Sequence, residues 1–204
     1  MTPHSNNPSR RAILGAGLGA GAMLLLPRTA RALTTDQAAK LVNTVVDEIN
    51  GLINSGRSLG QIQSGFERIF SRYADVPIIA RSVLGPAARS ASSAQLNAFT
   101  NAFQGYIARK YSRRFNEFKG TAIKVHSARP YKNFYEVKST AYLKGQSPVE
   151  VVFLVSDKSG KDKFFNIFIE GVNMLATERT EIGALLDKRR GDVDALTSDL
   201  RTMG

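Results

Sequence analysis

The 204-residue chain contains no cysteine and no tryptophan, and it has only two histidines. Without cysteine there is no disulfide framework, no thiol nucleophile, no cysteine-based zinc site and no iron–sulfur cluster. Hydrophobic residues make up 43% of the chain and charged residues 22%, which is typical of a globular domain and not of a disordered chain. Any chemistry must therefore come from other side chains.

Acidic residues are also few. The chain has 17 Asp and Glu against 28 Lys and Arg, a formal net charge of +11. Four of the arginines lie in the first 32 residues, so residues 33–204 keep 24 basic residues against 17 acidic ones, a net charge of +7. Such a surface suits phosphate-rich or acidic partners.

The first 32 residues have the order of a targeting segment. A start without acidic residues leads to Arg10 and Arg11, an apolar glycine-rich stretch covers residues 12–26, and Ala30-Arg31-Ala32 has the small-x-small pattern of a cleavage site. The apolar stretch of about 15 residues is shorter than the roughly 20 that a spanning helix needs. We therefore predict a cleaved signal peptide over residues 1–32.

The adjacent arginines favour twin-arginine export, with Sec export as the alternative. No cysteine follows the predicted cleavage site, so we expect no lipoprotein anchor and a mature chain, residues 33–204, in the periplasm. An exported protein seldom meets nucleic acid. Lipid head groups and acidic protein surfaces are then the expected partners of the basic chain.

Hydrophobic residues spaced three or four apart predict a helical first half of the mature chain. Thr34 with Gln37 and Ser92 with Gln95 have capping-box spacing and predict two helix starts. The expected helices cover residues 34–55, Leu59–Tyr73, Val76–Arg89, kinked or divided at Gly85-Pro86, and a long helix from Ser92 to Phe118.

From residue 121 the hydrophobic period drops toward two, which predicts strands. Short connections rich in turn formers join them, so neighbouring strands should run antiparallel. The expected strands are Thr121–Arg129, Phe134–Leu143, Val149–Ser156 and Phe164–Glu170, and two helices, Met174–Leu186 and Val193–Leu200, should follow. The predicted class is α+β, with helices packed around a curved antiparallel sheet of about four or five strands in one domain.

Two short patterns suggest other chemistry. Residues 56–60 (Gly-Arg-Ser-Leu-Gly) match the nucleophile elbow of serine hydrolases, but that pattern requires a strand before Ser58, and a helix is expected there. His126 is the only histidine of the mature chain, and it falls on a predicted strand. The basic run from Arg109 to Lys119 fits a solvated helix end or a binding patch.

Three motifs together resemble the MlaC family, the toluene-tolerance-type periplasmic phospholipid-binding proteins. The first is residues 66–75 (Phe-Glu-Arg-Ile-Phe-Ser-Arg-Tyr-Ala-Asp), followed by residues 79–85 (Ile-Ala-Arg-Ser-Val-Leu-Gly). The second is Phe99 to Phe103 with Tyr111, and the third is residues 166–174 (Asn-Ile-Phe-Ile-Glu-Gly-Val-Asn-Met), with Arg179 shortly after it. The resemblance covers roughly residues 35–203.

The chain departs from the family pattern at three positions. The Trp and Asp that usually lie near the start of the last strand appear as Asp162 and Asn166, and the Ser of the third motif is Asn173. These changes alter the charges around that strand, and they bear on which lipid the protein binds. Because some relatives occur with hopanoid-handling genes, a hopanoid is the alternative cargo to a phospholipid.

The resemblance implies that helices and sheet enclose an apolar lipid pocket with the head group at its mouth. It implies a monomeric periplasmic carrier that exchanges phospholipid with an inner-membrane ABC transporter complex and an outer-membrane lipoprotein complex. Such a carrier maintains the lipid asymmetry of the outer membrane. The resemblance also implies that the protein needs no catalytic residue, cofactor or metal. The expected head-group residues are Arg81 and Arg179. The expected lipid-binding residues are Val83, Leu84, Phe99, Phe103, Tyr106, Val151, Phe153, Ile167, Ile169, Val172 and Met174.

Two other hypotheses stay open. The first is a protein-binding module of an envelope complex with a filled core and no lipid. The second is a hydrolase that uses Ser58. For each apolar residue named above, ordinary core packing is the competing interpretation, since helical or alternating spacing reports burial without saying against what.

Overall fold

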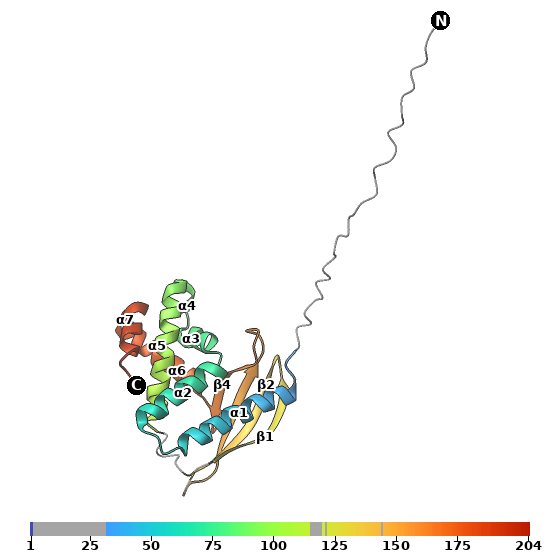
Figure 1. The fold of residues 1–204 in the computed structure, drawn as a ribbon. Coiled ribbons are helices and arrows are strands. Elements are labelled where there is room, and N and C mark those ends of the chain that lie inside the picture. Colours follow the sequence, from blue (N-terminus) through green and yellow to red (C-terminus); the bar gives the residue numbers. More distant parts are fainter. Residues whose placement is uncertain (2–31, 115–119, 121, 144) are drawn as a thin grey trace. The chain divides into compact units, whose positions relative to one another are not determined.

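The computed structural model describes residues 1, 32–114, 120, 122–143 and 145–204 (Figure 1). Residues 32–204 form one structural unit, distinct from residues 1–31. Apart from Met1 and Ala32, the predicted signal peptide lies outside the described residues. Among the residues that the structure describes, no helix is both long enough and apolar enough to cross a membrane.

Three of the helices in the first half begin with a capping box. The hydroxyl groups of Thr34, Ser58 and Ser92 each accept a hydrogen bond from the backbone N–H of a glutamine three residues later, and that glutamine side chain binds back to the cap. These contacts satisfy N–H groups that have no partner inside the helix. The helices of this half are α1 (Thr35–Ile53), α2 (Leu59–Tyr73), α3 (Val76–Leu84), α4 (Ala87–Ser90) and α5 (Ser93–Ser112).

The helical region predicted over Val76–Arg89 divides into α3 and α4 at Gly85-Pro86, where the sequence predicted a kink or a division. Gly85 has φ 63°, a left-handed backbone conformation that glycine adopts without strain. Asp75 occupies the N-cap position of α3, but its side chain makes no capping hydrogen bond. The long helix is shorter than expected, because α5 ends at Ser112. Residues 115–118 of the predicted extension to Phe118 lie outside the described residues.

The strands form a five-stranded antiparallel meander in the order β1-β2-β3-β4-β5. Short turns connect neighbours, so each strand pairs with the next one along the chain. Sequence reasoning missed β5, a two-residue strand that returns after a turn in which Glu170 and Gly171 both have positive φ. The strands are β1 (Ala122–Tyr131), β2 (Phe134–Tyr142), β3 (Val149–Ser156), β4 (Lys163–Ile169) and β5 (Val172–Asn173).

Helix α1 lies across the sheet and packs on β1, β2 and β3 (Figure 1). The other helices gather beside β4, among them α6 (Met174–Lys188) and α7 (Val193–Leu200). Phe99 and Phe103 of α5 have fully buried side chains at the centre of this group, with ring centroids 5.9 Å apart. The fold is therefore α+β, with helices packed against an antiparallel sheet, as predicted. Strand β4 is the part of the sheet that both α3 and α6 of this group contact.

Candidate functional site

An apolar pocket of about 160 Å³ lies between β4 and the helices α2, α3, α5 and α6. Aromatic and aliphatic side chains form most of its wall, and Asn166 and Glu178 are its polar members. The full lining is Phe66, Phe70, Ile79, Phe103, Ile107, Tyr111, Phe164, Phe165, Asn166, Ile167, Ile169, Met174, Leu175 and Glu178. This lining suits a hydrocarbon group and provides few polar anchors.

The pocket reaches the surface near the end of β4. Ile169 lines the pocket and is 37% exposed, whereas Phe103 on the opposite wall is fully buried. Glu170 follows Ile169 in the β4–β5 turn, where its carboxylate accepts a hydrogen bond from the backbone N–H of Glu150 on β3. The turn that carries the exposed edge of the pocket is therefore fixed to the sheet.

The structure brings four of the eleven predicted lipid-binding residues to the pocket. They are Phe103, Ile167, Ile169 and Met174. Val172 is 54% exposed on β5. The other six are buried in the hydrophobic core and do not line the pocket: Val83, Leu84, Phe99, Tyr106, Val151 and Phe153.

The two predicted head-group arginines lie on neighbouring helices outside the pocket lining. Arg81 of α3 and Arg179 of α6 are both exposed. The Arg179 guanidinium lies so close to the α-carbon of Gly85 that a β-carbon added there would be 3.3 Å from it. Whether either arginine contacts a head group stays a prediction.

Sequence reasoning missed most of the aromatic wall. Phe66 and Phe70 follow one another on one face of α2, with ring centroids 6.3 Å apart, and Phe70 packs on Phe164 of β4. Phe66 and Phe70 belong to the first family motif, and their spacing of four places them on one helical face. That spacing gave no indication that this face meets β4, because the contact joins distant parts of the chain.

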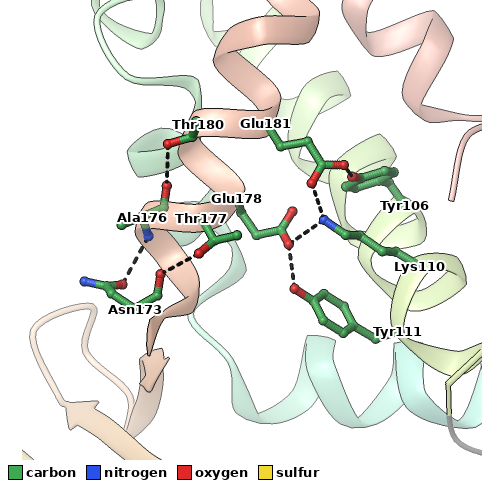
Figure 2. Close-up of polar contacts among 9 residues, drawn as sticks. All are labelled: Tyr106, Lys110, Tyr111, Asn173, Ala176, Thr177, Glu178, Thr180 and Glu181. Carbon is green, nitrogen blue, oxygen red and sulfur yellow. Dashed lines mark hydrogen bonds and ion pairs between the residues drawn. The ribbon is translucent and has the colours of Figure 1, made fainter. Parts of the chain in front are cut away.

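A polar cluster of five residues joins α5 to α6 at one wall of the pocket (Figure 2). The Lys110 ammonium lies 2.7 Å from Oε1 of Glu178 and 2.5 Å from Oε2 of Glu181. The Tyr111 hydroxyl donates to Oε1 of Glu178 at 2.5 Å, and the Tyr106 hydroxyl donates to Glu181. Glu178 is 5% exposed, and its Oε2 is buried without a hydrogen-bond partner among the described residues.

The cluster changes the acidity of its members. Burial raises the pKa of Tyr106 and Tyr111, and the hydrogen bonds to Glu181 and Glu178 raise it further. Burial lowers the pKa of Lys110, but its hydrogen bonds to the two glutamates outweigh that effect and leave the pKa raised. Lys110 is therefore a fixed cation at neutral pH, and it compensates the buried Glu178.

The same cluster predicts a loss of stability in acid. Burial opposes ionisation of Glu181, but hydrogen bonds from Lys110 and Tyr106 outweigh it and hold the pKa of Glu181 below its ordinary value of 4.5. A carboxyl with a lowered pKa stabilises the fold above its ordinary pKa, and that contribution disappears as the pH falls through the lowered value. We expect the urea concentration at the unfolding midpoint to decrease as the pH drops below about 4.5. The decrease should be smaller in Glu181→Gln over the same pH range. An equal fall in both proteins would contradict this assignment.

A pair of asparagines connects β4 to the start of α6. Asn166 is 7% exposed. Its Oδ1 accepts hydrogen bonds from the backbone N–H groups of Ile167 at 2.8 Å and Leu175 at 3.1 Å. Its Nδ2 donates a hydrogen bond to Oδ1 of Asn173 at 2.9 Å. Asn173 is the N-cap of α6 and also accepts from the N–H of Ala176 (Figure 2). The pair stands where the family pattern has Asp and Ser.

The geometry predicts that Asn166→Asp alone is destabilising. The new carboxylate would lack the amide donor and face Oδ1 of Asn173, which we expect to lower the free energy of unfolding by about 2 kcal/mol. The double variant Asn166→Asp, Asn173→Ser should recover most of that loss, because a serine hydroxyl can donate to the carboxylate. Urea denaturation of both variants tests this coupling. Equal destabilisation by the single and double variants would contradict it.

Ser58, the residue of the elbow-like pattern, caps α2. Its hydroxyl lies 3.4 Å from the backbone nitrogen of Gln61 and 3.2 Å from Oε1 of the same residue. Helices lie on both sides of it, and not the strand that an elbow requires. The glycines at 56 and 60 therefore belong to a helix–helix turn.

The fold and the pocket define an α+β protein with an apolar cavity between an antiparallel sheet and a group of helices. Residues 39–202 match the family described as MlaC protein, so the chain belongs to the MlaC family, as its motifs predicted.

The structure of this chain resembles the solved structure of the phospholipid-binding protein from Ralstonia solanacearum in complex with a phospholipid. The two are 20% identical with a TM-score of 0.68, and the match covers 80% of this chain and 94% of the other. At this level of identity, the likeness shows a common fold.

Proposed function

We propose that this protein is a periplasmic lipid carrier that shields the tails of a phospholipid in the apolar pocket. The observation that carries the proposal is the pocket itself, whose wall is almost entirely hydrocarbon and aromatic. Membership of the MlaC family supports it, as does the fold shared with a protein solved in complex with a phospholipid.

The physical task of such a carrier is to replace one apolar environment by another. A phospholipid with about 30 tail methylenes, at ~0.8 kcal/mol each, would need about 24 kcal/mol to enter water unaided. Transfer into a dry pocket avoids that barrier and breaks no covalent bond. The carrier therefore needs shape and apolar surface, and its direction of transport must be set by its partners.

The pocket is small for this task. Pockets that hold drug-sized ligands usually have volumes of about 300–1,000 Å³, and this one has about 160 Å³. A lipid tail therefore requires the wall to widen, by movement of the helices against β4 or of side chains that close the pocket.

Extraction of the purified protein with organic solvent, followed by mass spectrometry, tests the proposal. We expect close to stoichiometric phospholipid. Recovery of a hopanoid would instead support the triterpenoid alternative within the same family. A protein that never carries lipid, even after incubation with phospholipid vesicles, would overturn the proposal and favour a protein-binding module.

The proposed partners are an inner-membrane ABC transporter complex and an outer-membrane lipoprotein complex. A groove of about 480 Å³ between α1 and α2 supports contact with acidic surfaces, since Arg57, Arg68 and Arg72 line it with Glu48 as its acidic member. Glu48 is already bound by Arg72 at 3.3 Å and by the Tyr73 hydroxyl at 2.6 Å. The groove therefore keeps excess positive charge for a partner.

A further inference from the structure

The apolar pocket has a neighbour that shares one of its walls. A second cavity of about 300 Å³ lies between the start of α3 and the turns at the ends of β2 and β3. Phe165 of β4 lines both cavities. On the facing helix, Ile78 lines the second cavity and the next residue, Ile79, lines the apolar pocket. Side chains of α3 and β4 therefore separate the two spaces.

Phe165 is suited to act as a movable partition. Its ring is only partly buried and contacts Phe134 edge-on, with centroids 5.4 Å apart. The backbone beside it is fixed, because the N–H of Asp75 donates to the carbonyl of Phe164 at 2.8 Å. A rotamer change of the ring could therefore join the two cavities without breaking the contact between the α2–α3 connection and β4.

The second cavity is amphipathic, unlike the first. Phe134, Phe165 and Ile78 give it an apolar side, and the polar side consists of Asp75, Asn133, Ser156, Lys158 and Ser159. Among the described residues, the Lys158 ammonium has neither a hydrogen bond nor an ion pair to a side chain. Asp75 is the acidic member of the lining.

The turn that carries these polar groups is held in place. The backbone N–H of Lys158 donates to the Ser156 hydroxyl at 3.3 Å, and the N–H of Gly160 donates to the carbonyl of Asp157 at 2.8 Å. The Asp157 carboxylate in turn accepts from the N–H of Leu33 at 2.8 Å. Donors on a fixed turn lose little conformational freedom when they bind an anion.

We propose that the bound lipid passes Phe165, so that its tails occupy the apolar pocket and its phosphate-bearing polar end lies in the second cavity beside Lys158. This inference rests on the proposed lipid-carrier function and specifies where the polar end binds. An ammonium and two hydroxyl groups are suitable donors to phosphate oxygens. The joined cavities also supply room that the apolar pocket alone lacks.

Single-cysteine labelling tests the location, because the chain contains no cysteine of its own. We expect loading with phosphatidylglycerol to protect Ser159→Cys from a maleimide reagent, while Ser90→Cys on α4 stays reactive. Arg179→Cys reports on the site that the sequence predicted. Protection of Arg179→Cys with no protection of Ser159→Cys would overturn the inference.

Charge reversal supplies a second test. Lys158→Glu should weaken phosphatidylglycerol binding by about tenfold, whereas Lys161→Glu in the same turn, outside the cavity lining, should not. Equal effects of the two variants would overturn the inference. If the unmodified protein takes up no lipid, the proposed function itself fails, whereas lipid uptake without a selective effect at position 158 or 159 removes only this inference.

Discussion

Ile169→Asp is expected to remove most of the bound lipid while the fold persists. Ile169 lines the pocket and is 37% exposed, so the folded protein without lipid can keep the new carboxylate in water. A lipid tail in the pocket would exclude that water, and the cost of burying an unpaired charge should lower lipid affinity by about 100-fold or more. The measurement is the lipid-to-protein ratio after extraction, with circular dichroism as the check on folding.

Leu59→Asp is the matched control. Leu59 is 47% exposed at the start of α2 and lines none of the three cavities described above, so its replacement should leave lipid content unchanged. Val151→Asp should also reduce lipid content, but with greater loss of stability, because Val151 is paired with Ile169 in the β3–β4 register and is buried in the core outside the pocket lining. Phe103→Asp should also abolish binding, with greater loss of stability, because its side chain is fully buried. Undiminished lipid in Ile169→Asp would contradict the assignment of the lipid tails to this pocket.

Lys110→Ala is expected to lower the free energy of unfolding by about 3 kcal/mol. Glu178 would keep the Tyr111 hydroxyl as a donor, but its buried charge would lose the cation 2.7 Å away. Lys188→Ala, at the exposed end of α6, should change stability by no more than about 0.5 kcal/mol. Urea denaturation at neutral pH compares the two variants.

The double variant Lys110→Ala, Glu178→Leu tests whether the loss of stability comes from the unpaired charge of Glu178 or from removal of the Lys110 side chain itself. Replacing both partners of a buried ion pair by apolar groups is often close to neutral, so the double variant should be more stable than Lys110→Ala alone. If Lys110→Ala behaves like Lys188→Ala, the polar cluster does not hold α5 against α6. The same double variant leaves the pocket wall more apolar and should retain lipid.

Local signals in the sequence predicted most of the fold. Capping boxes, turn formers and the change of hydrophobic period depend on residues a few positions apart, and they placed α2, α7 and β3 at the ends observed. The two-residue strand β5 was missed, because a strand that short has no period of its own. The predicted long helix was wrong at Arg113 and Arg114, which form a turn after α5 ends at Ser112, because apolar spacing alone does not mark a helix end.

The pocket could be predicted only in part, because spacing reports that a residue is buried and not what it is buried against. Phe99 and Phe103 stand four residues apart on the same helix and are both fully buried, yet only Phe103 lines the pocket. Glu178 gave no sequence signal at all. Its burial depends on Lys110, 68 residues earlier in the chain, and such a pairing is set by how helices pack.

The apolar pocket also ties cargo binding to the order of folding. Its wall joins α2 near Phe66 to α6 near Glu178, whereas each pair of neighbouring strands in the meander forms from adjacent sequence. Contacts between distant segments form late, because closing a long loop carries a large entropy loss. We therefore expect the sheet to acquire protection from hydrogen exchange before the cavity exists, and lipid uptake to begin only once refolding is nearly complete.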